Sequence, residues 1–127
     1  MPDNTLDTTM IRIYGIRNCD TMKKALTWLD SQAIAYTFHD YKREGIDSTT
    51  LTDWVARVGR EPLVNTRGTT WRKLPDEARR IDSDADAIAL MQANTSLIKR
   101  PVLDTGDGRL LVGFNADTYA TELTERR

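Results

Sequence analysis

The chain has 127 residues, a formal net charge of −1 at pH 7 and a single cysteine. This length fits one domain, and the balanced charge excludes the strong positive field of a nucleic-acid-binding domain. No apolar run approaches the roughly 20 residues of a membrane span, and the polar start lacks the features of a signal peptide. One cysteine excludes an internal disulfide, and one histidine adds little to a metal site. We therefore expect a cytoplasmic monomer without metal or tightly bound cofactor, binding neither nucleic acid nor membrane.

The first part of the chain predicts a strand–helix–strand unit after a disordered leader at residues 1–9. Segment 10–15 alternates apolar and polar side chains, and residues 35–41 do the same, so both predict strands. From Asp20 onward, apolar residues recur with the spacing of one helix face. These residues are Met22, Ala25, Leu26 and Leu29. Two strands joined through a helix by short links predict a βαβ unit, whose strands are parallel.

The middle of the chain, about 46–94, predicts a helical insert within a single domain spanning residues 10–123. A helical stripe there ends at Gly59, and Ser83 with Asp86 forms a capping box before an apolar helix. This segment is too short to be predicted as a domain of its own.

The last part of the chain predicts a hairpin followed by a helix. Two apolar runs, "RPVLD" and "RLLVGF", flank a tight-turn signal at Asp107-Gly108. Asn115 then stands where an N-cap residue begins a final amphipathic helix. The predicted order is therefore β-α-β, helices, β-β-α.

Cys19 stands at the junction of the first strand and the first helix, with Asn18 or Cys19 itself as the predicted N-cap. A helix start offers unpaired N–H groups and partial positive charge, both of which stabilise a thiolate. A free thiol, with a pKa of about 8.5, is roughly 3% ionised at pH 7. Lowering that pKa by two units, worth about 2.7 kcal/mol, makes it about three-quarters ionised. We predict that Asn18, Asp20 and Thr21 support the thiolate, and that the cation Arg17 lies nearby.

The alternative is a structural role, because a free cysteine often behaves as a small buried apolar residue. The neighbours Arg17, Asn18 and Asp20 are polar, which favours the reactive interpretation. Spacing then narrows the chemistry. Met22 occupies the place of the second thiol in a Cys-x-x-Cys pair, and Ala25 the place of the arginine in a low-molecular-weight phosphatase loop. The second thiol must come from another molecule, and glutathione is the obvious small donor in a reducing cytosol.

Four segments together resemble the arsenate reductase-related family (ArsC/Spx/YffB-like), most closely its YffB-like branch. They are "YGIRNCDTMKKALTWL", "FHDYKREGI", "NTRGTTWRKL" and "LIKRPVL", and the resemblance covers residues 11–123. It implies an α/β, thioredoxin-like fold, with a mixed four-stranded sheet in βαβ–ββα order and a helical insert. It also implies that Cys19 is the catalytic nucleophile.

The resemblance further implies an anion- or glutathione-binding set. Arg100 matches the family's arginine before a cis-proline, Pro101 matches that proline, and Val102 would offer backbone hydrogen bonds to a bound thiol peptide. We add Arg67 and Arg17 to this set. The alternative for Arg100 is a solvent-exposed arginine beside a strand, and the alternative for the segment of Arg67 is a loop plus short helix whose Trp71 packs against the core.

The sequence departs from the family at two of three oxyanion-binding arginines. Asn65 aligns with one of them, and "VGFNAD" provides no match for another, which disfavours arsenate as the physiological substrate. We predict a glutathione- or glutaredoxin-dependent single-cysteine reductase that acts on a disulfide, mixed disulfide or oxyanion through the Cys19 thiolate. The alternatives are an Spx-like, non-enzymatic regulatory partner of the transcription machinery, and a retained fold whose thiol is a vestige.

Overall fold

The computed structural model describes residues 11–17 and 19–124. The predicted leader, Met10 and Asn18 lie outside the described residues. The chain forms two compact units, one joining the residues up to Asp40 with those from Arg100 onward, the other comprising Tyr41–Lys99. The predicted insert falls inside the second unit, and its place within one single domain stays a prediction.

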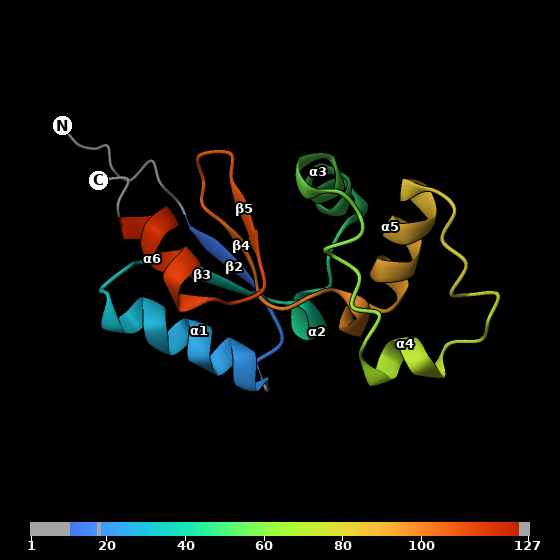
Figure 1. The fold of residues 1–127 in the computed structure, drawn as a ribbon, viewed down its shortest axis with the longest axis horizontal. Helices are drawn as coiled ribbons and strands as arrows, with labels where there is room; N and C mark the ends of the chain where they lie inside the picture. The colour runs from blue at the N-terminus through green and yellow to red at the C-terminus, as the bar shows by residue number, and fades with distance from the viewer. Residues whose placement is uncertain (1–10, 18, 125–127) are drawn as a thin grey trace. The chain divides into compact units, whose positions relative to one another are not determined.

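The first unit is built on a four-stranded sheet (Figure 1). Its strands are β2 (Arg12–Gly15), β3 (Thr37–Asp40), β4 (Val102–Asp104) and β5 (Leu110–Val112), in the order β3-β2-β4-β5. Strand β2 is parallel to β3 and antiparallel to β4, and β4 is antiparallel to β5. This is the mixed sheet of the predicted thioredoxin-like fold.

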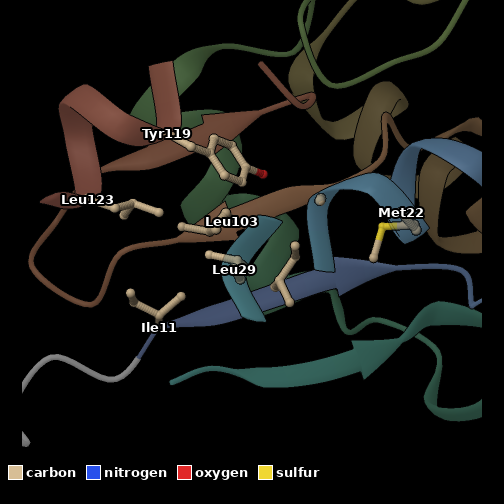
Figure 2. Packing of buried hydrophobic residues seen from close by; sticks show 8 residues of the cluster. Ile11, Met22, Leu29, Leu103, Tyr119 and Leu123 are labelled. Atoms are coloured by element: carbon tan, nitrogen blue, oxygen red, sulfur yellow. The ribbon is translucent and has the colours of Figure 1, made fainter. Parts of the chain in front are cut away.

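Helices α1 (Asp20–Ser31) and α6 (Ala116–Thr124) pack on the sheet of this unit. Met22, Ala25 and Leu29 are fully buried on the apolar face of α1, as the helical spacing predicted. Figure 2 shows how these helices share a core with β2 and β4. The buried residues of this cluster are Ile11, Ile13, Met22, Ala25, Leu29, Leu103, Tyr119 and Leu123.

The hairpin between β4 and β5 is held by Thr105, which is fully buried. Its backbone N–H donates to the carbonyl of Arg109 at 3.1 Å, and its Oγ1 accepts from the Arg109 N–H at 3.3 Å. The Arg109 guanidinium reaches the carboxylates of Asp107 and Glu122 and donates to the Glu122 carbonyl at 3.0 Å. Arg109 therefore ties the hairpin to α6 through Glu122, while its contact with Asp107 lies within the hairpin turn.

The second predicted strand is shorter than the alternating pattern indicated. Strand β3 ends at Asp40, and Tyr41 instead begins the short helix α2 (Tyr41–Glu44). The reason is packing, because the Tyr41 ring is buried and lies edge-on to Trp54, with 6.4 Å between ring centroids. Gly45 then ends the helix with a φ of +70°, which glycine adopts without a steric penalty.

The second unit is helical around an isolated bridge between Val64 and Ile98. Besides α2 it contains α3 (Ser48–Val58), α4 (Thr69–Lys73), α5 (Asp84–Ala93) and the 3₁₀ turn η1 (Thr95–Leu97). Across the residues that the structure describes, no helix is both long and apolar enough to cross a membrane.

The predicted ends of the helices in this unit are observed with one difference. Gly59 ends α3 with a φ of +85°, and Ser83 caps α5 by accepting from the Asp86 N–H at 3.1 Å. The Asp86 carboxylate accepts from the Asp82 N–H at 3.1 Å, one residue earlier than the Ser83 N–H of a regular capping box.

Candidate functional site

Cys19, one of the two residues predicted as the N-cap, is the N-cap of α1 and follows the end of β2 closely in the chain. Its backbone is extended, with φ −141° and ψ 129°, and its carbonyl accepts from the Lys23 N–H at 2.9 Å. The side chain is half-buried and packs against the edge of the core cluster. The thiol therefore touches the core, as the structural alternative expected, and also stands at the helix start.

Several groups act on the ionisation of this thiol. Burial raises the pKa of Cys19, but the backbone N–H of Met22, the guanidinium of Arg100 and the backbone N–H of Thr21 together lower it below its ordinary value. The thiol makes no regular side-chain capping bond to α1. This fits the weakness of sulfur as an acceptor in its neutral form. These donors therefore favour the thiolate over the thiol.

Arg100 reaches the thiol because of the order of strands in the sheet. The register pairs Tyr14 of β2 with Val102 of β4, near the same sheet edge at which β2 leads toward Cys19. The Arg100–Pro101 bond is cis, as the resemblance implied, and the Pro101 carbonyl accepts from the Gly113 N–H at 2.8 Å. The structure thus brings Arg100 and Cys19 together from distant parts of the sequence.

Val102 is fully buried and paired in the sheet with Tyr14 on one side and Val112 on the other. The roles of Pro101 and Val102 in binding glutathione stay predictions.

The other predicted site residues have different surroundings. Asp20 and Thr21 are exposed in the first turn of α1. The guanidinium of Arg17 lies over the Phe38 ring of β3, 5.1 Å from its centroid, a cation–π contact. Apart from the effect of the Thr21 N–H on the thiol, the roles predicted for these residues and for Asn18 stay predictions.

Arg67 belongs to the second unit, where its backbone N–H donates to Asn65 Oδ1 at 3.1 Å. Its proposed reach to Cys19 therefore also stays a prediction. Over the described parts of the chain, no group of three or more His, Cys, Asp or Glu side chains is placed to hold a metal ion.

Met22 is a residue that the sequence indicated only as part of the core. The structure adds that its N–H acts on the thiol while its side chain is fully buried. The available signal was position, since the N–H groups two and three residues after an N-cap point toward the cap side chain.

Comparison with known proteins places these features in context. The model of the ArsC family matches residues 14–121. A solved structure of a YFFB protein is 50% identical, with a TM-score of 0.87 over 91% of this chain and 100% of its own. An arsenate reductase (ArsC) related protein from Brucella melitensis is also 50% identical, with a TM-score of 0.70 over 91% of this chain and 95% of its own.

A curated relative with a different printed role is the global transcriptional regulator Spx of Staphylococcus epidermidis. It is 29% identical over 85% of this chain and 82% of its own length. The chain is therefore similar both to a protein described as arsenate reductase related and to one described as a transcriptional regulator.

Proposed function

Because the chain belongs to the ArsC family, we propose that it is a thiol-dependent reductase whose nucleophile is Cys19 and whose donor is glutathione or glutaredoxin. One observation carries the proposal: the lone thiol lies at a helix start where two backbone N–H groups and Arg100 lower its pKa. The thiolate is the form of cysteine that attacks disulfides. We expect the reaction to take place in the cytoplasm, where reduced glutathione is abundant.

The first step is exchange on a mixed disulfide, R–S–S–G, in which G is glutathione. The Cys19 thiolate attacks the glutathione sulfur, the substrate S–S bond breaks, and R–S⁻ leaves and takes a proton from solvent. Cys19 is then joined to glutathione by a new disulfide. The N–H groups of Met22 and Thr21 stabilise the charge on Cys19 before the attack and again when it leaves.

The second step needs a thiol from outside, because the chain holds one cysteine. A second glutathione thiolate, or a glutaredoxin thiol, attacks the glutathione sulfur of the adduct. This releases the Cys19 thiolate and forms oxidised glutathione or a glutathionylated glutaredoxin. Over the two steps the substrate R–S–S–G is released as the thiol R–SH, and its glutathione moiety leaves in a new disulfide with the external thiol, which is oxidised in exchange.

Arg100 has a second part in this proposal. Its guanidinium presents donors in a planar fork that suits carboxylates and oxyanions. Glutathione carries two carboxylates, so a cation beside the thiol favours binding of the donor as well as ionisation. An oxyanion substrate would use the same cation, which keeps arsenate among the substrates to be tested.

The test is mass spectrometry of the intact protein after exposure to oxidised glutathione, with a parallel sample given arsenate and reduced glutathione. We expect one glutathione adduct, located on Cys19 and removed by reduced glutathione. The Cys19→Ser variant, which has no thiol, is the matched control. An unmodified wild-type protein, or an apparent thiol pKa at or above about 8.5, would contradict the proposed function.

A second candidate function follows from the similarity to Spx, which is named a global transcriptional regulator. In this alternative the fold is a regulatory partner of the transcription machinery and Cys19 is not needed for binding. Purified RNA polymerase should then bind the wild-type protein and Cys19→Ser equally well. No binding by either protein, together with a glutathione adduct on Cys19, favours the reductase.

A further inference from the structure

An open groove of about 500 Å³ runs along helix α1 in the first unit. Its lining comes from α1, between the first turn and the last, and from the segment that leads from β5 into α6 (Figure 1). Lys23, Lys24, Thr27, Trp28 and Phe114 are among the lining residues. A volume of this size suits a small ligand or a short peptide segment. None of these side chains takes part in the reaction steps proposed above.

The apolar part of the groove is formed by two aromatic rings that are held from beneath. Trp28 and Phe114 are both half-buried, and each lies edge-on to the ring of Tyr119, with 5.7 and 4.9 Å between ring centroids. Tyr119 is fully buried in the core cluster. Edge-to-face contacts are favourable, so this core residue fixes both rings. Aromatic side chains held in this way are good anchors for a partner, because little conformational entropy is lost on binding.

The charged part of the groove is positive. Lys23 and Lys24 are exposed and line it, and no acidic residue is among the described residues that do so. Asp20 and Asp117, in the first turns of α1 and α6, are not part of the lining. Charge complementarity therefore favours a partner that presents carboxylates beside a large apolar side chain, and disfavours a basic partner.

The groove begins one helical turn from the thiol. The Lys23 N–H donates to the Cys19 carbonyl at 2.9 Å, in the first turn of α1. From Cys19 to Trp28 the helix rises about 14 Å, at roughly 1.5 Å per residue. An extended peptide advances about 3.3 Å per residue, so about four residues cover this distance. A peptide whose cysteine lies at the Cys19 sulfur can thus place a side chain about four residues away against Trp28.

We propose that the groove holds a segment of the protein whose mixed disulfide Cys19 attacks, with a large apolar side chain between carboxylates about four residues from the oxidised cysteine. This rests on the proposed function and names glutathionylated proteins with such an acidic segment as the substrate class. In the exchange the peptide S–S–G bond breaks, a Cys19 S–S–G bond forms, and the peptide thiolate leaves and takes a proton from solvent. The groove holds the substrate and takes no part in the bond changes.

The test is single-turnover exchange with matched glutathionylated peptides, followed by mass spectrometry of the protein. The first peptide has a tryptophan between two aspartates, with the tryptophan four residues from the cysteine on both sides. The second has alanine in place of each tryptophan. We expect the first peptide to transfer its glutathione roughly tenfold faster at concentrations below saturation. A third peptide, with lysines in place of the aspartates, should react several-fold more slowly than the first, and this gap should close in about 1 M salt.

Two variants assign the effect to the groove. Thr27 is exposed and lines the groove, and glutamate is a good helix former, so Thr27→Glu is expected to fold. The added carboxylate repels the acidic peptide and should lower its advantage to about twofold or less. Position 27 lies about 12 Å along the helix from Cys19, beyond the roughly 8 Å Debye length at physiological salt, so exchange with oxidised glutathione should stay near the wild-type rate. Thr52→Glu, the same change at an exposed position of α3, is the matched control and should keep the full advantage.

The outcomes separate the two proposals. If the first two peptides react equally fast while oxidised glutathione still forms an adduct on Cys19, the groove proposal is wrong and the reductase proposal stands. If Thr52→Glu removes the advantage as fully as Thr27→Glu does, the effect does not come from the groove and the groove proposal is also wrong. If no donor forms an adduct on Cys19, both proposals fail. Sedimentation of the wild-type protein is the last check, because a dimer that Thr27→Glu dissociates would mean that a second copy of the chain occupies the groove.

Discussion

Helices α1 and α6 pack in the same unit, but they begin in different ways. Asn115 begins α6, and its Oδ1 accepts from the Thr118 N–H at 3.0 Å. Cys19 begins α1 and makes no regular side-chain capping bond. An amide oxygen is a full acceptor at any pH, whereas a thiol becomes one only when it ionises. The first turn of α6 is therefore satisfied permanently, and that of α1 is satisfied best when Cys19 is a thiolate.

Two arginines sharpen the same contrast. Arg109 contacts the carboxylates of Asp107 and Glu122. Arg100 acts on a thiol, which is neutral until it loses its proton. A cation that pairs with a carboxylate stabilises the folded structure, whereas a cation beside the thiol shifts the equilibrium from thiol to thiolate. Both residues are arginines, so the role of each is set by the group that it contacts.

The largest expected effect comes from removing the thiol at the start of α1, compared with a matched change at the start of α6. Cys19→Ser should abolish alkylation and the formation of a glutathione adduct, because a serine hydroxyl does not ionise near neutral pH. Mass spectrometry measures the loss directly. Asn115→Ser, the matched change at α6, should keep the adduct at the wild-type level, and its loss there would mean that the two helix starts are not independent.

The next effect concerns the two arginines. Arg100→Gln should raise the pKa of Cys19 and lower the alkylation rate at pH 7 several-fold, because the thiolate loses a positive neighbour. Arg109→Gln should leave that rate unchanged and lower the free energy of unfolding by about 1 kcal/mol, the size typical of a partly exposed ion pair with a hydrogen bond. Equal rates for the two variants would contradict the role given to Arg100.

A smaller effect is expected from the cap of α6. Asn115→Ala removes the acceptor of the Thr118 N–H and should lower the free energy of unfolding by about 1 kcal/mol. Denaturant unfolding measures this change. The pKa of Cys19 should stay at the wild-type value, since Asn115 is not among the groups that shift it.

The smallest effect is a pH dependence of stability. The folded pKa of Cys19 is lowered, so ionisation stabilises the fold above the unfolded value of about 8.5, and this contribution is lost as pH falls through the folded value. Serine is a better N-cap than a neutral thiol, so Cys19→Ser should be more stable at low pH by up to about 1 kcal/mol. Unfolding at several pH values should show this advantage shrinking as pH rises, and a constant difference would contradict a lowered pKa.

Local patterns in the sequence predicted much of this structure. The spacing of apolar residues predicted α1, and short polar signals predicted the caps at Ser83 and Asn115. The position of Cys19 at a helix start followed from the change of period after Gly15. The predicted end of β3 was wrong because Tyr41 continues the alternating pattern of a strand. Its ring instead packs against Trp54, and no local sequence pattern indicates that contact.

The partners of the thiol were less accessible to sequence reasoning. Arg100 was proposed through family resemblance, because its place beside Cys19 depends on the pairing of Tyr14 with Val102 far along the chain. Met22 looks ordinary in sequence, as a core residue of the first helix, and its N–H acts on the thiol only because Cys19 is the N-cap of that helix.

The pairing of β2 with β4 also sets when the site comes into being. Cys19 leaves the ribosome early, with β2, whereas Arg100 and β4 are synthesised near the end of the chain. A nascent chain thus carries its thiol through most of translation without the neighbouring strand and cation. Without the Arg100 guanidinium, we expect the pKa of the thiol to lie closer to its ordinary value during that time. The lowered pKa of Cys19 thus depends in part on a residue that is synthesised long after it.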